Sequence, residues 1–211
     1  KAKGRAENTK PYFDLMYETV QSILAKSGHI NHKYLKESES DKKAVIVVTA
    51  NRGLAGGYNS NITRMIIDEG FTKENTVVYA VGKKGRELLE RKGYEIKADY
   101  SEAINDPIYK DAKEICDDVL SAFADGEVGE IYLAYTVFKN TVVHEPQLIR
   151  LLPVEADDAA HETDGSEALM TYEPSEEEAL DMIIPKYVCS LVYGALIESV
   201  ASENGARMQA M

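Results

Sequence analysis

Apolar positions recur with helical spacing near both ends of the chain. The positions that follow steps of three and four residues are Phe13, Met16, Val20 and Ile23, and then Leu180, Ile184, Tyr187, Leu191 and Gly194. This spacing is typical of a helix that packs along another helix. The sequence therefore predicts N- and C-terminal long helices that form an antiparallel coiled coil.

The C-terminal helix has a recognisable start and one expected irregularity. Ser175 and Glu178 have the spacing of a capping box, which predicts a helix that begins there and continues to the last residue. Pro185 lacks the backbone N–H that a helix interior needs and crowds the preceding turn. We therefore expect a kink or a restart of the helix at Pro185.

The central part of the chain alternates between strand-like and helical patterns. Short runs rich in β-branched residues cover 44–49 and 76–81, a third strand is expected at 94–98 ("YEIKA"), and a helical pattern covers 108–124. Such alternation is typical of right-handed crossovers in a parallel sheet. Two longer strand-like runs follow and meet at Lys139, Asn140 and Thr141, which predicts an antiparallel hairpin at one edge. The expected fold class is α/β, with a Rossmann-like, mostly parallel sheet.

These patterns divide the chain into three expected parts. Residues 1–40 form an N-terminal coiled-coil helix, residues 41–174 an α/β domain, and residues 175–211 a C-terminal coiled-coil helix. The stretch "EADDAAHETDG", at 155–165, is acidic and poor in apolar residues, so we expect a solvated loop there.

The charge and the cysteines exclude several classes of protein. The chain has 24 Lys and Arg against 36 Asp and Glu, a formal charge of −12, which disfavours nucleic acid and anionic lipid as partners. Cys116 and Cys189 lie far apart with no thiol or histidine at ligand spacing, so we expect reduced, packed thiols rather than a zinc site or a disulfide framework. No uninterrupted apolar run is long enough to span a membrane, and no secretion signal is recognisable, so we expect a soluble chain.

The stretch "VVTANRGLAGGYNSNI", at 47–62, is a glycine-rich loop between a strand and a helix, a common place for a phosphate. A Walker loop needs Lys and then Ser or Thr after its last glycine, whereas Gly57 is followed by Tyr58. The dinucleotide fingerprint G-x-G-x-x-G is also absent, because the glycines fall at 53, 56 and 57. A small nucleotide-binding α/β enzyme that uses this loop stays as the alternative hypothesis.

Other candidate chemistry is weak. His29 and His32 are three residues apart, but a metal would need a third ligand, and we expect a solvated helix end there. The sequence predicts no catalytic residue, no metal site and no cofactor.

Two stretches resemble signatures of the gamma subunit of F-type rotary ATP synthases. The glycine-rich loop is similar to T-S-D-R-G-L-C-G-G-x-N-S-N, and the closing "YVCSLVYGALIESVASENGARMQAM" is similar to a C-terminal signature with the core S-E-x-x-A-R-M-x-A-M. "LLPV" and "YEPSEEEALD" match the family in order and distance. Departures from the family pattern are Ala50, Asn51, Ala55, Pro185 and Cys189, which we expect to loosen a capping interaction and the helix geometry.

The resemblance implies a rotor that forms the central stalk of the synthase and lies at the cytoplasmic face of the bacterial plasma membrane. Its coiled coil, whose extreme ends are expected to lie outside this sequence, would turn inside the ring of alpha and beta subunits. Its α/β foot would bind the epsilon subunit and the c-ring, while nucleotide binds to other chains. The implied partner-contacting residues are Arg52, Gly53, Leu54, Gly56, Gly57, Tyr172, Glu173 and Arg207. Arg52 would pair with carboxylates of the beta subunit's acidic catch loop.

Overall fold

The computed structural model describes residues 14–25, 32–35, 38–154 and 175–211. Residues 14–25 are helical. The remaining helices and strands are β1 (Lys43–Val48), α2 (Tyr58–Asp68), β2 (Thr76–Val81), α3 (Lys83–Arg91), β3 (Glu95–Asp99), η1 (Ser101–Ile104), α4 (Tyr109–Ala124), β4 (Glu130–Phe138), β5 (His144–Leu152) and α5 (Glu176–Ala210). Phe13, Gly28, His29, the acidic stretch at 155–165, Tyr172 and Glu173 lie outside the described residues.

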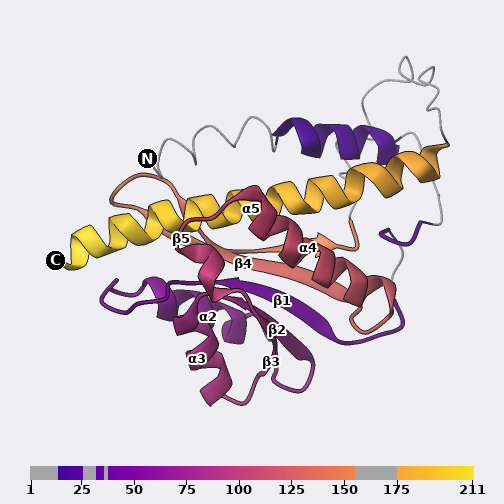
Figure 1. Ribbon diagram of the computed structural model, residues 1–211. Coiled ribbons are helices and arrows are strands. Elements are labelled where there is room, and N and C mark those ends of the chain that lie inside the picture. Colours follow the sequence, from indigo (N-terminus) through magenta and orange to yellow (C-terminus); the bar gives the residue numbers. More distant parts are fainter. Residues whose placement is uncertain (1–13, 26–31, 36–37, 155–174) are drawn as a thin grey trace.

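The sheet has the strand order β3-β2-β1-β4-β5 (Figure 1). β1 pairs in parallel with both β2 and β4, β3 pairs in parallel with β2, and β5 pairs with β4 in the antiparallel direction. This confirms the α/β fold class, the mostly parallel sheet and the antiparallel edge hairpin. The order also places β1 in the centre, with helices on both faces of the sheet (Figure 1).

The residues of β1 alternate between two hydrophobic cores, because successive side chains of a strand point to opposite faces. Val45 and Val47 pack with Ile62 of α2 and Leu89 of α3. Ala44, Ile46 and Val48 pack on the other face, in a core that α4, α5 and the helix at 14–25 share. Burial on both faces explains why the first strand reads as a continuous apolar run.

The helix at 14–25 lies along the first half of α5 and runs in the opposite direction (Figure 1). Met16, Val20 and Ile23 share the core with α5, and the rings of Tyr17 and Tyr187 have their centroids 6.3 Å apart. The antiparallel pairing of the terminal helices is therefore confirmed for the described residues.

His32 extends this pairing and corrects the expectation of a solvated helix end. It is only 1% exposed, and its Nε2 lies 2.7 Å from a carboxylate oxygen of Asp181 on α5. Its Nδ1 accepts a hydrogen bond from the Tyr34 amide, which places the ring proton on Nε2 and lets it donate to Asp181. The segment after the first helix is thus held against the start of α5.

α5 begins as predicted and runs as a single helix past Pro185. The Ser175 side chain accepts a hydrogen bond from the Glu178 amide, so Ser175 is the N-cap. The helix continues without a break through Pro185, so the expected restart does not occur. Ile184 and Val188, on either side of the proline, are fully buried, and this packing holds the helix together where one backbone bond is missing.

The edge hairpin has a longer loop than predicted. β4 ends at Phe138 and β5 begins at His144, so Val142 and Val143 belong to the loop and not to a strand. The reason is the side chain of Asn140, whose oxygen accepts hydrogen bonds from the amides of Val142 and Val143, each at 2.8 Å. These two amides therefore do not donate hydrogen bonds between β4 and β5.

α5 also has the length and composition of a membrane span, with a window of mean hydropathy 1.5. Of the residues in that window, 61% are buried inside the protein, which is typical of a core helix. The criterion of an uninterrupted apolar run does not identify this segment, because polar residues interrupt it.

Candidate functional site

The glycine-rich loop at 49–57 connects β1 to α2 and is shaped by Asn59. The side-chain oxygen of Asn59 accepts a hydrogen bond from the Ala50 amide at 2.8 Å, and its Nδ2 donates to the Arg52 carbonyl at 3.5 Å. Ala55 and Tyr58 are buried beneath the loop. These contacts therefore hold the loop on both sides of its tip.

The tip presents an apolar side chain to solvent. Leu54 is 91% exposed and has a φ of 64°, in the left-handed region that non-glycine residues rarely adopt. Gly56 has a similar φ of 60°, and Arg52 and Gly57 are exposed with it. An exposed leucine in a costly conformation is typical of a contact site rather than of a structural turn.

The side of the loop that faces α5 presents carbonyl groups to a cation. The guanidinium of Arg207 donates to the carbonyl oxygens of Gly53 at 2.7 Å and of Arg52 at 3.1 Å. It also donates to the carboxylate of Glu203, one turn earlier on α5, at 2.7 and 2.9 Å. Phosphate-binding loops direct N–H groups to their ligand, so this side of the loop has the opposite polarity.

Tyr58 forms a second link between the loop and α5. Its hydroxyl donates to the Ser199 carbonyl at 3.0 Å, and its ring is buried. Burial, together with the nearby Glu203 carboxylate, raises the pKa of the Tyr58 hydroxyl far above its usual value, so it stays a hydrogen-bond donor. Tyr58 and Arg207 thus hold the loop to the last three turns of α5.

A cavity of about 370 Å³ lies where the loop, the edge hairpin and the end of α5 meet. His144 lines it, and among the described residues neither ring nitrogen of His144 has a hydrogen-bond partner. Gly205 allows this close packing, since a Cβ there would lie 2.5 Å from Cε1 of His144. Gln209 closes the arrangement by donating to the carbonyls of Thr141 and Val142.

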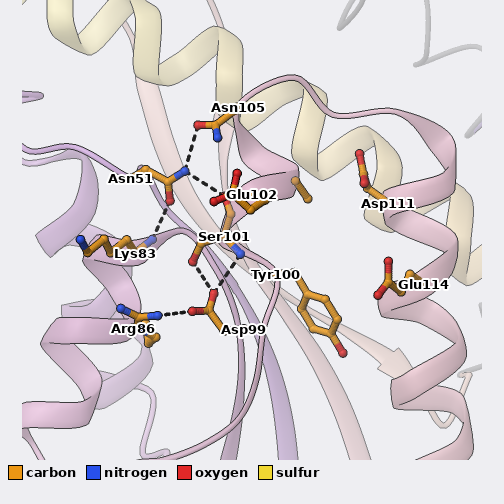
Figure 2. A pocket seen from close by; sticks show the side chains of 11 residues that line it. Asn51, Lys83, Arg86, Asp99, Tyr100, Ser101, Glu102, Asn105, Asp111 and Glu114 are labelled. Atoms are coloured by element: carbon orange, nitrogen blue, oxygen red, sulfur yellow. Dashed lines mark hydrogen bonds and ion pairs between the residues drawn. The ribbon is translucent and has the colours of Figure 1, made fainter.

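A larger cavity, of about 700 Å³, lies at the carboxyl ends of β1, β2 and β3, where α/β enzymes bind their ligands. Figure 2 shows Asn51 at its edge, accepting from the Lys83 amide at 2.9 Å and donating to the Ser101 carbonyl and the Asn105 side chain. Asn51 therefore caps α3. The departure at this position does not loosen the capping interaction, because the amide also supplies donors that an aspartate lacks.

Two charged groups of this cavity, Arg86 and Asp99, form an ion pair. Asp99 accepts hydrogen bonds from Arg86 and from the amide and hydroxyl of Ser101 (Figure 2). Burial opposes the ionisation of Asp99, but the hydrogen bonds from Ser101 and the Arg86 charge outweigh it and lower the pKa of this carboxyl. Within the described ranges, no three His, Cys, Asp or Glu residues are placed to hold a metal ion.

The structure brings together the predicted partner-contacting residues that it describes; Tyr172 and Glu173 lie outside the described residues. Arg52, Gly53, Leu54, Gly56, Gly57 and Arg207 lie around one loop, but Arg207 points inward to that loop. Sequence reasoning missed Tyr58, Asn59 and Glu203. The spacing of Glu203 and Arg207, four residues apart on a helix, was an available signal for their ion pair.

Comparison with known proteins gives consistent matches over the whole chain. The family model described as ATP synthase matches residues 1–211. The ATP synthase gamma chain of Lachnoclostridium phytofermentans is 62% identical over all of this chain and 75% of its own length. The sodium ion specific gamma chain of Acetobacterium woodii is 37% identical, with the same shares covered. Among solved structures, a chain from the central stalk and c-ring of the Tetrahymena thermophila mitochondrial ATP synthase has a TM-score of 0.66 at 22% identity, covering 99% of this chain and 93% of its own.

Proposed function

Because this chain belongs to the family of ATP synthase gamma chains, we propose that it transmits torque between a membrane c-ring and the catalytic alpha and beta subunits. The supporting observation is that α5 packs into the core that covers one face of the sheet, while its first half pairs with the helix at 14–25 (Figure 1). A helix held in this way turns together with the body. Rotation of the body would therefore rotate the shaft.

The proposal divides the chain by task. Residues 1–40 and 175–211 form the coiled-coil shaft, and residues 41–174 form the foot that contacts the epsilon subunit and the c-ring. The loop with Arg52, Gly53, Leu54, Gly56 and Gly57 contacts the beta subunit, and Arg207 holds this loop in position. Tyr172 and Glu173 contact the c-ring.

The chain itself supplies no catalytic residue in this proposal, and the reaction takes place on other subunits. Asymmetry of the shaft changes the contacts that each beta subunit makes as it turns, and only differential contacts of this kind can shift the states of a partner. The complex lies peripherally at the cytoplasmic face of the bacterial plasma membrane. A small nucleotide-binding enzyme is not favoured, since the family is that of a synthase subunit and the loop directs carbonyls to Arg207.

The test is assembly of the full-length chain with alpha and beta subunits. We expect an ATPase in which a probe attached to the exposed foot rotates during hydrolysis, whereas alpha and beta alone give no rotation. Calorimetry of the chain alone with ATP should show no binding tighter than about millimolar, or roughly 4 kcal/mol. Tight stoichiometric binding of ATP, or an assembled ATPase without rotation, would reject the proposal.

A further inference from the structure

Two cysteines that are distant in the sequence meet where α4 packs on α5. The buried side chains of Cys116 on α4 and Cys189 on α5 lie in the same core, and the two thiols interact electrostatically. Independently, Sγ of Cys116 lies 3.7 Å from the carbonyl oxygen of Pro185, one helical turn before Cys189. Both contacts place the two sulfur atoms at the same level of the helix pair.

A second contact fixes the alignment of these helices. The rings of Tyr109 on α4 and Tyr193 on α5 pack edge to face, with their centroids 5.8 Å apart. Because Tyr109 precedes Cys116 while Tyr193 follows Cys189, α4 and α5 run in opposite directions. Contacts at both positions prevent the helices from sliding past each other, so the thiols stay opposed.

The environment of the pair favours thiol chemistry at Cys189. Both thiols are free, and their residues are only 1% and 4% exposed. The interaction with Cys116, helped by the Tyr109 hydroxyl, outweighs the effect of burial and lowers the pKa of the Cys189 thiol, and the same interaction raises the pKa of Cys116. The thiolate is the nucleophilic form of cysteine. Charged neighbours on α4 are Lys113 and Asp117.

We propose that Cys116 and Cys189 form a reversible dithiol–disulfide pair that a hydroperoxide oxidises and that cross-links α4 to α5. This inference rests on the helix contacts and goes beyond the proposed rotor function. Hydrogen peroxide is the fitting oxidant, because it is small enough to reach a buried thiol as the helices fluctuate.

The reaction proceeds in two balanced steps. The Cys189 thiolate attacks one peroxide oxygen, the O–O bond breaks, and Cys189 becomes a sulfenic acid while the leaving oxygen takes up a proton to give water. The sulfur of Cys116 then loses its proton and attacks the Cys189 sulfur, so that an S–S bond forms, the S–O bond breaks and a second water leaves. The two thiols are oxidised by two electrons and the peroxide is reduced. A small dithiol reverses the reaction by exchange.

The experiment uses the full-length chain in its synthase complex, treated with hydrogen peroxide and then with an alkylating reagent. We expect a mass lower by two hydrogen atoms, loss of alkylation at both cysteines, and a linked peptide that contains Cys116 and Cys189. Dithiothreitol should restore both thiols. Tyr109→Phe keeps the ring contact with Tyr193 but removes one hydrogen bond to Cys189, so the linked form should appear several-fold more slowly.

Cys116→Ser provides the matched control, with Cys116→Ala as a second variant in case serine disturbs the packing. Without its partner, Cys189 should accumulate as a sulfenic acid that dimedone traps. The proposal is overturned if both thiols of the natural chain stay alkylatable after treatment, if Cys189 is oxidised to the sulfinic acid without a linked peptide, or if the disulfide joins two chains. Each of these outcomes can occur whether or not the chain works as a rotor.

Discussion

At the scale of single residues, Asn51 connects three segments that the sheet alone would leave separate. Its side chain reaches the start of α3 through the Lys83 amide and the segment after β3 through the Ser101 carbonyl and Asn105. An amide is suited to this position because it both accepts and donates, whereas a carboxylate only accepts. The residue therefore orders the wall of the larger cavity.

Substitutions of Asn51 should separate the contribution of the Lys83 bond to stability from the contribution of the bonds to Ser101 and Asn105. Asn51→Ala removes all of them and should lower the free energy of unfolding by about 1–3 kcal/mol. Asn51→Asp keeps the bond from the Lys83 amide at a helix N-terminus, where a negative charge contributes about 0.3–1 kcal/mol, so it should cost less than alanine. Urea denaturation of the natural chain and of the two variants measures the order of their free energies of unfolding. An aspartate variant less stable than the alanine variant would show that the side-chain oxygen does not face Lys83.

At the scale of elements, the terminal helix pair depends on a buried polar link as well as on apolar packing. His32 connects the Tyr34 amide to the Asp181 carboxylate, at the end of the helix pair where the chain turns toward the sheet. A buried histidine that satisfies two polar partners is costly to remove, since the buried Tyr34 amide would lose its hydrogen bond without access to water and the Asp181 carboxylate would lose its link to this segment.

We expect His32→Ala to lower the free energy of unfolding by about 2–3 kcal/mol and to increase amide exchange in the helix at 14–25. Lys33→Ala is the matched control. Its amine is exposed and lies 3.8 Å from the same Asp181 carboxylate, and a surface pair of this kind contributes about 0–1 kcal/mol. Hydrogen exchange followed by mass spectrometry compares the two variants. Equal protection of the helix in both would contradict a role for the His32 link.

The elements themselves were largely predictable, because local patterns determine them. Runs of β-branched residues identified β1 and β2, a short strand-like run identified β3, and the helical spacing of apolar residues identified α4 and α5. The hairpin loop was predicted two residues too short, since nothing in the pattern shows that the Asn140 side chain takes the amides of Val142 and Val143. Long-range polar contacts were not predictable. His32 and Asp181 are 149 positions apart, and neither spacing nor composition relates them.

Long-range contacts of the glycine-rich loop at 49–57 were likewise not predictable from the sequence. Its resemblance to the family signature implied that residues of this loop contact a partner, and Leu54 at its tip is exposed. The inward direction of Arg207 was not predictable, because the signature places the arginine on a helix without showing which face is covered. Only the fold brings the end of α5 beside the loop after β1.

At the scale of the whole molecule, α5 is held to the body at several levels. From its start to its end, the links are His32 with Asp181, Cys116 with Pro185, Tyr58 with Ser199, Arg207 with the glycine-rich loop, and Gln209 with the edge hairpin. They come from different elements and lie on different turns, so a torque on the body is distributed along the helix. A shaft held at one point only would rotate against its foot.

Substitutions at Arg207 and Arg52 separate two properties of the glycine-rich loop. Arg207 holds the loop in position, and the exposed Arg52 side chain is proposed to contact a partner. Arg207→Ala removes the two bonds to the loop carbonyls and leaves the largely buried Glu203 carboxylate without its ion pair. It should therefore lower the free energy of unfolding by about 2–4 kcal/mol and reduce the number of ions pumped per ATP hydrolysed. Asn204→Ala, at an exposed position of the same helix, should change neither quantity, because its side chain faces solvent.

Arg52→Ala should affect coupling alone. The Arg52 side chain is exposed, and the bonds that hold its part of the loop use its backbone carbonyl, which the alanine variant keeps. Its free energy of unfolding should stay within about 0.5 kcal/mol of the natural chain, while pumping per ATP falls, since the variant lacks the charge that we propose to pair with carboxylates of the beta subunit. Reconstituted vesicles with a fluorescent ion probe measure pumping, and phosphate release measures hydrolysis. Unchanged pumping in Arg52→Ala would remove this side chain from the contact surface, and the exposed Leu54 tip would then be the part of the loop that meets the beta subunit.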